Sequence, residues 1–242
     1  MTTNKKDIFK IISTLIFFAV NLNNIVYGGN VYIDQNKKPL LDYQVIGEKV
    51  EKIYGVKLNR PVTVIFKETP GGRFNCESNE IFINQNDPLQ KKLVTIAHET
   101  SHLMHCQITN NKSTNEELRF VDEGLASIIG QRITGDEDSY KAQTKEESAL
   151  ERDKGNVSFE LVKKWKKYFG TGNIATSNWK AYRVGSSFIY YLIYKYGEGT
   201  PFDFLKYLER SSFQEALLKT TGNSEQEIEV AWLEYIYEQG KI

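Results

Sequence analysis

Two histidines and a glutamate within residues 93–104 have the spacing of a zinc-binding helix. His98, Glu99 and His102 form the pattern H-E-x-x-H. On an α-helix, imidazoles four residues apart lie one turn apart on the same face, so one nitrogen of each can reach a single ion. Glu99 then stands next to a zinc-activated water and can act as its general base. The pattern predicts one zinc ion per chain, with His98 and His102 as ligands.

The rest of this helix indicates which side is packed. An apolar stripe recurs at helical spacing, at Leu89, Leu93, Ile96, Thr100, Leu103 and Met104. At about 100° per residue, His98 and His102 lie on the opposite side. We therefore expect a helix at the floor of a cleft, with one side packed and the other presenting metal ligands.

A third ligand is expected because catalytic zinc usually takes three protein ligands and keeps one position for water. Glu123 follows His102 after twenty residues, on the next predicted helix. It lies almost opposite that helix's apolar stripe, and Ser127 and Gly130 beside it leave little bulk between the two helices. We predict Glu123 as the third ligand. Asp122 is the fallback, although its place on the helix suits the surface better.

His105 is the remaining histidine. It lies seven residues beyond His98, about 10 Å along a straight helix, which is too far for all three histidines to bind one ion. A pair formed by His102 and His105 is the alternative, but it leaves Glu99 without a role. We otherwise expect His105 beside the ligands or at the rim of the site.

These residues together resemble the gluzincin clan of zinc metallopeptidases, which use the two histidines of H-E-x-x-H and a downstream glutamate. Residues 181–192, with Tyr182 three residues before Gly185, are similar to the aminopeptidase-like branch, where such a tyrosine stabilises the oxyanion. Residues 213–232 look like the helical tail of small peptidase-MA-like domains. The resemblance covers residues 60–240. It implies a thermolysin-like domain that hydrolyses peptide bonds, with Glu99 and Tyr182 as catalytic residues.

The chain departs from the gluzincin pattern in two places. Several relatives have an aspartate four residues beyond the glutamate ligand to orient a zinc histidine, and this chain has Ser127 there. Aminopeptidases of the branch also carry a glycine-rich motif upstream of the zinc helix, with an acidic residue that binds the substrate amine. Only Pro70-Gly71-Gly72 resembles it here, without that acid. Endopeptidase and aminopeptidase stay open, and the missing acid favours an endopeptidase or a specialised peptidase.

The order of the predicted elements indicates an α+β fold. Strand-like runs at 31–33, 62–66 and 80–84, with a helical stretch near 40–53, predict a small mixed sheet lobe over residues 29–86. We expect the strand at 80–84 to be an edge with which an extended substrate could pair. Apolar spacing is helical over residues 87–242, with helix start signals at Asp87-Pro88, Thr114, Ser212 and Ser224. The sequence predicts one metallopeptidase-like domain with a helical second lobe.

Residues 1–28 read as an export signal. Three lysines precede a ten-residue apolar stretch, and Val26-Tyr27-Gly28 offers a cleavage site. The mature protein is then periplasmic or secreted and has no stable membrane span, with an uncleaved anchor as the alternative. Export favours a disulfide between Cys76 and Cys106. Two free thiols remain the alternative, because spacing alone does not place their Cα atoms within reach.

The charge balance bears on partners. The chain has 31 basic and 31 acidic residues, and a net charge of zero argues against a nucleic-acid partner. The expected partner is a peptide or protein substrate, and the sequence leaves the oligomeric state unknown. The alternative function is a catalytically silent zinc-binding or envelope-interaction module on the same fold.

Overall fold

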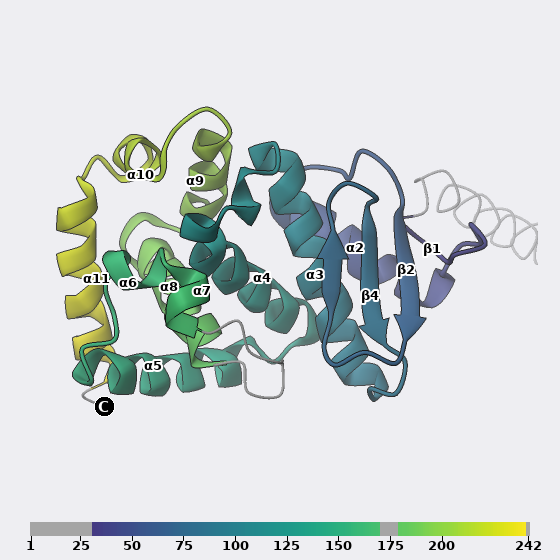
Figure 1. The fold of residues 1–242 in the computed structure, drawn as a ribbon, viewed down its shortest axis with the longest axis horizontal. Helices are drawn as coiled ribbons and strands as arrows, with labels where there is room; N and C mark the ends of the chain where they lie inside the picture. Colours follow the sequence, from purple (N-terminus) through teal and green to yellow (C-terminus); the bar gives the residue numbers. More distant parts are fainter. Residues whose placement is uncertain (1–30, 170–178, 241–242) are drawn as a thin grey trace, which may run out of the picture.

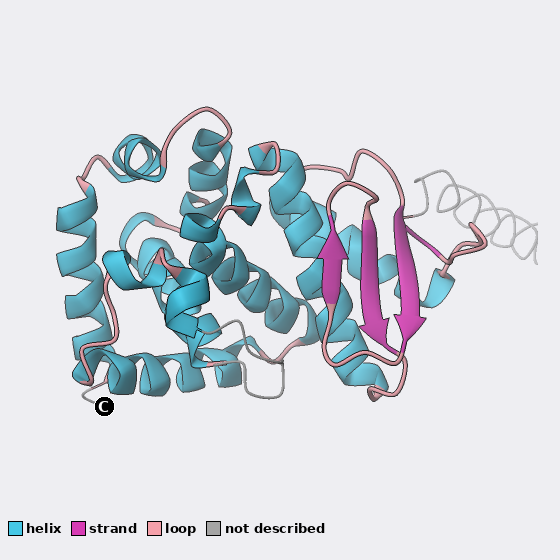
Figure 2. Ribbon diagram, in the orientation of Figure 1, coloured by secondary structure: helices cyan, strands magenta, loops and turns pink. Residues whose placement is uncertain are grey.

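The computed structural model describes residues 31–169 and 179–240, so the predicted export signal lies outside the described residues. Figure 2 shows a small sheet at one end and helices over the rest of the described chain. The predicted α+β class is confirmed. Among the described helices, none combines the length and apolar character needed to cross a membrane.

The sheet has four strands in the order β1-β2-β4-β3. They are β1 (Tyr32–Ile33), β2 (Val62–Lys67), β3 (Arg73–Asn75) and β4 (Glu80–Asn84). β1, β2 and β4 are parallel neighbours, and β3 runs antiparallel to β4. Helix α2 (Leu41–Tyr54) makes the crossover that a parallel β1–β2 pair requires. Alternate residues of the central strands are buried on the face that packs against helices: Val62, Val64, Ile81 and Ile83.

The edge strand differs from the prediction. β4 lies between β2 and β3, so the expectation that residues 80–84 form an edge is wrong. The edge strand beside β4 is β3, in which Phe74 pairs with Ile81, and β1 is the other edge strand. β3 has only three residues and directly follows the turn-forming segment Pro70-Gly71-Gly72. The sequence pattern there is that of a turn, and three residues are too few to show the alternation of apolar residues that marks a strand. Such a strand forms because β4 offers it a partner, which a local pattern does not reveal.

Helix α3 (Leu89–Thr109) carries the H-E-x-x-H segment and lies between the sheet and helix α4 (Arg119–Thr134), as Figure 1 shows. Its predicted apolar stripe is largely buried, apart from Leu89, which is 63% exposed in the first turn. The opposite side is buried as well, because α4 lies along it and leaves His102 only 1% exposed. The side of α3 that carries His98 and His102 is therefore packed against α4, and it does not form the open floor of a cleft that the sequence predicts.

The helix start signals had mixed outcomes. Ser212 and Ser224 form reciprocal capping boxes at the starts of α10 (Phe213–Thr221) and α11 (Glu225–Gln239), as predicted. Asp87 does not cap α3, which begins after Pro88 without a side-chain cap. Thr114 starts no α-helix, because two 3₁₀ turns over residues 112–118 precede α4.

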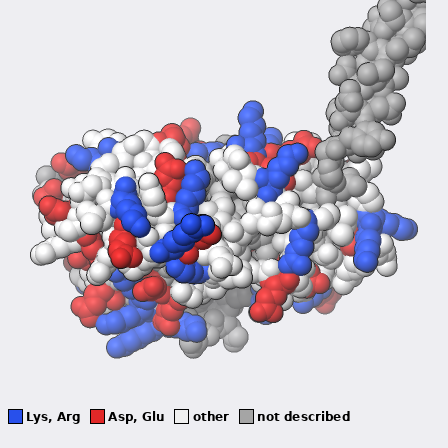
Figure 3. Space-filling view, turned by 90° about the horizontal axis from the view of Figure 1, so that it is seen from above, with Lys and Arg blue, Asp and Glu red and all other residues white. Residues whose placement is uncertain are grey.

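The helices beyond α4 build the second half of the described chain. They are α5 (Glu137–Asp153), α6 (Phe159–Val162), α7 (Trp165–Phe169), α8 (Lys180–Tyr196) and α9 (Thr200–Leu208), followed by α10 and α11. Figure 3 shows acidic and basic side chains intermixed on the face seen from above.

Helix α8 crosses α4 at two glycines. A Cβ atom added to Gly124 would overlap the backbone of Gly185, and one added to Gly185 would overlap the carbonyl of Phe120. The two backbones are therefore in direct contact at this crossing, which leaves no room for a side chain at either glycine.

A disulfide joins Cys76 to Cys106, with the Cα atoms 6.1 Å apart. The choice between a bridge and two free thiols, which the sequence left open, is thereby settled. Cys76 directly follows the edge strand β3, and Cys106 lies in the last turns of α3. The bridge thus ties the end of the edge strand to the helix that carries His98 and His102.

Replacing both cysteines with alanine is expected to lower the free energy of unfolding by about 3 to 4 kcal/mol, because the bridge closes a loop with a sequence separation of 30. Urea unfolding with and without a thiol reductant measures the change. The reductant should bring the wild-type value down to that of the variant and leave the variant unaffected. A wild-type stability that does not respond to the reductant would contradict the bridge.

Candidate metal centre

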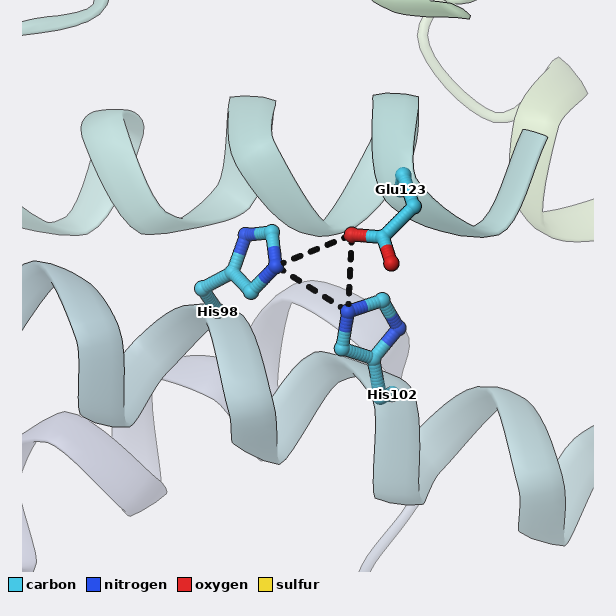
Figure 4. A group of neighbouring side chains, drawn as sticks. All are labelled: His98, His102 and Glu123. Carbon is cyan, nitrogen blue, oxygen red and sulfur yellow. Dashed lines mark hydrogen bonds and ion pairs between the residues drawn. The ribbon is translucent and has the colours of Figure 1, made fainter. Parts of the chain in front are cut away.

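Three side chains from two facing helices converge on one point, as Figure 4 shows. Nε2 of His98 and Nε2 of His102 on α3 are 3.0 Å apart. Oε2 of Glu123 on α4 lies 3.2 Å from each of them. Ligands at zinc-binding distances in a tetrahedron are separated by about 3.3 Å. The structure therefore brings the three predicted ligands together at nearly the spacing that a zinc ion requires.

The close approach of α3 and α4 depends on a small residue. A Cβ atom added to Gly130 of α4 would lie 3.1 Å from the carbonyl oxygen of Val94 and 3.5 Å from Cβ of His98. A larger residue would separate the helices where His98 faces α4. This agrees with the expectation that Gly130 leaves little bulk between Glu123 and the zinc helix.

The group opens to solvent on the His98 side. The side chains of His98, Glu123 and His102 are 17%, 5% and 1% exposed. Tyr182 of α8 lies beside His98, with the ring centroids 6.3 Å apart. The Glu123 carboxylate and burial raise the pKa of Tyr182, so its hydroxyl stays protonated and can donate a hydrogen bond. The structure thus places the predicted oxyanion donor next to the predicted ligands.

Glu99 is 5% exposed, and burial raises its pKa above the ordinary range of a carboxyl group. The backbone of Gly72, just before β3, lies directly against this side chain, since an added Cβ would overlap its Oε1 and the methyl group of Thr95. The backbone just before β3 therefore contacts the carboxyl group of Glu99, the predicted general base. Only a glycine at position 72 leaves room for this contact.

Asp122 occupies a different place from the one predicted. It is 1% exposed, so the expectation of a surface position is wrong. Its Oδ1 lies 2.9 Å from Nδ1 of His102, outside ordinary hydrogen-bond angles, and 2.6 Å from Nδ1 of His105. Asp122 thus lies directly behind His102, on the side of the ring away from Glu123.

Three neighbouring side chains explain why Asp122 is ionised. Burial alone would raise its pKa, but His102, His105 and Arg119 hold it well below the usual range. Arg119 donates from Nη1 to Oδ2 of Asp122 at 2.6 Å, and its Nη2 donates to Oε1 of Glu123. The second oxygen of Glu123 is therefore occupied, which leaves Oε2 for a metal ion.

His105 is fully buried beside the ligands, so it is not at a rim. Its Nδ1 faces Asp122 and its Nε2 lies 2.5 Å from the hydroxyl of Tyr54. His102, His105 and Asp122 also form a group close enough to hold an ion. Both nitrogens of His105 already have protein partners, however, so the geometry favours His98, His102 and Glu123.

The sequence did not identify Arg119 or Phe74. Phe74 of β3 stacks on the His102 ring, with centroids 4.3 Å apart and planes inclined by 21°. Arg119 precedes its two acidic partners by three and four residues, the spacing of ion pairs on one helix face, so the signal was present. Phe74 had no such signal, because its contact with His102 depends on the unpredicted strand β3.

The charges of the site fit a divalent cation. Asp122 and Glu123 are ionised beside Arg119, because neighbouring cationic side chains hold the pKa of both carboxyl groups below the usual range despite their burial. Burial lowers the pKa of His102, but Asp122 and Glu123 outweigh this effect and raise it to about 10. The carboxylates therefore favour positive charge where the ligands meet.

No protein-family model, curated protein or solved structure matches the chain. The geometry and charge of the site therefore carry its assignment.

Proposed function

We propose that this protein is a zinc-dependent peptidase of the gluzincin type, with His98, His102 and Glu123 as metal ligands. One observation carries the proposal: three ligand atoms from α3 and α4 meet within 3.2 Å of one another, and Glu99 lies on α3 between the two histidines. The ionised carboxylates of Asp122 and Glu123 beside the two histidines also suit a divalent cation.

Zinc in such a site supplies a water acidified towards neutral pH and a Lewis acid for the substrate carbonyl. Glu99 would accept the proton of the attacking water and then pass that proton to the leaving amine. Tyr182 donates a hydrogen bond to the oxyanion that develops on the carbonyl oxygen. Arg119 and Asp122 keep Glu123 and His102 in place.

The substrate in this proposal is an extended peptide. β3 is the edge strand on the side of the metal centre, and Gly72 just before it lies against Glu99, so a peptide paired with β3 would run past the general base. This moves the proposed pairing from residues 80–84 to residues 73–75. The Cys76–Cys106 disulfide supports the proposal that the enzyme works outside the cytosol, as the sequence predicts.

The test combines a measurement of zinc content with a peptide-cleavage assay. Purified mature protein is expected to contain one zinc ion per chain and to cleave members of a random peptide library. A chelator should remove both properties, and added zinc should restore them. One bound zinc ion without any cleavage would favour the silent zinc-binding module. Metal-free protein whose stability does not respond to zinc would contradict the metal centre itself.

A further inference from the structure

A tyrosine from the sheet half of the molecule reaches the buried groups behind the metal centre. Tyr54 is the last residue of α2 and is 5% exposed. Its hydroxyl lies 2.5 Å from Nε2 of His105, and the two rings meet edge to face. His105 in turn faces Asp122, which stands behind His102. A continuous chain of buried contacts therefore runs from Tyr54 to a metal ligand.

The direction of these hydrogen bonds follows from their chemistry. An ionised carboxylate only accepts, so Nδ1 of His105 must carry the proton that it shares with Asp122. A neutral imidazole carries one proton, and here Nδ1 shares it with Asp122, so Nε2 is the acceptor for the Tyr54 hydroxyl. The Tyr54 hydroxyl therefore donates to Nε2. Without that donor, the proton of His105 could move to Nε2, and a lone pair of Nδ1 would then face the Asp122 carboxylate at 2.6 Å.

We propose that Tyr54 is a positioning residue for the metal centre: its hydroxyl fixes the tautomer of His105, and His105 thereby holds Asp122 against His102. The inference rests on the proposed zinc site. It assigns a role in metal binding to a residue on a helix that supplies none of the ligands. Loss of the hydroxyl lets Asp122 turn away from His102, so the ring of His102 is less well oriented towards the ion.

The chain offers a matched control. Tyr32 also comes from the sheet half, is fully buried, and contacts the same helix through its hydroxyl, 2.8 Å from Oγ1 of Thr100. It contacts neither His105 nor Asp122 through any described hydrogen bond. Tyr32→Phe therefore removes a comparable buried hydrogen bond from α3 without affecting the chain that leads to His102. Ser101→Ala is a second control, because Ser101 is also within reach of the Tyr54 hydroxyl.

The experiment measures zinc dissociation constants by competition with a chromophoric chelator, and stability by urea unfolding. Tyr54→Phe is expected to weaken zinc binding by about 10-fold or more, within the range for residues that orient metal ligands. Tyr32→Phe and Ser101→Ala should stay within about 2-fold of wild type, even where they lose as much stability. Equal zinc affinities in Tyr54→Phe and Tyr32→Phe would overturn the proposal.

A double-mutant cycle separates this role from a general loss of stability. In His105→Asn, the side-chain amide takes the place of Nδ1 and can donate to Asp122 without help from a tyrosine. Adding Tyr54→Phe to His105→Asn should then change zinc affinity by less than about 2-fold. An unchanged 10-fold effect in that background would contradict the relay through His105. A wild type that binds no zinc overturns the proposed metal centre, whereas zinc binding without peptidase activity leaves the role of Tyr54 intact.

Discussion

Glu99→Gln is expected to lower the rate of peptide hydrolysis by about 10²- to 10⁴-fold, the range for loss of a general base, with zinc still bound. Glu99 is not among the three converging ligands, so its substitution removes no metal contact. Glutamine has the same shape and cannot accept the proton of the attacking water. The conservative change matters here, because the backbone of Gly72 leaves no space for a larger side chain.

The measurement pairs turnover with zinc content for wild type and variant. Glu117→Gln is the matched control, since this exposed glutamate lies just before α4 and is expected to retain wild-type turnover. Wild-type turnover by zinc-loaded Glu99→Gln would remove Glu99 from the mechanism. Loss of zinc in that variant would instead make Glu99 part of the metal site.

Glu123→Ala is expected to weaken zinc binding by more than about 100-fold, beyond the usual effect of losing a residue that only orients a ligand. The variant removes the one carboxylate oxygen that faces both Nε2 atoms. It also leaves Arg119 with Asp122 as its remaining acidic partner on α4. Peptide hydrolysis should fall together with zinc content.

Competition with a chelator measures this effect, and Glu117→Ala serves as the control that keeps wild-type affinity. Glu123→Ala protein with unchanged zinc affinity would show that the ion is held elsewhere. The group of His102, His105 and Asp122 would then be the site to test, with Asp122→Ala as the deciding variant.

The candidate ligands could be predicted because helix geometry is a local property. His98 and His102 share a face through their spacing alone, and Glu123 was found from the apolar pattern of one helix. The capping boxes at Ser212 and Ser224 are equally local. These features depend on contacts three or four residues apart, which the sequence displays directly.

The surroundings of the ligands could not be predicted in the same way. Asp122 seemed suited to the surface because a helical wheel does not show that a second helix covers this face. Phe74 contacts His102 only because β3 pairs with β4, and Tyr54 reaches His105 across 51 positions of the chain. Such contacts depend on the packing of elements that are distant in sequence.

The glycine crossing of α4 and α8 has a consequence for attempts to re-engineer this protein. Gly124 directly follows Glu123, and Gly185 lies one helical turn beyond Tyr182. The distance between the two helix axes therefore sets how far Tyr182 stands from Glu123. A designer who wishes to alter specificity can vary the residues around this crossing, but the two glycines must stay fixed. Even one added methyl group there would move an entire helix and, with it, the tyrosine.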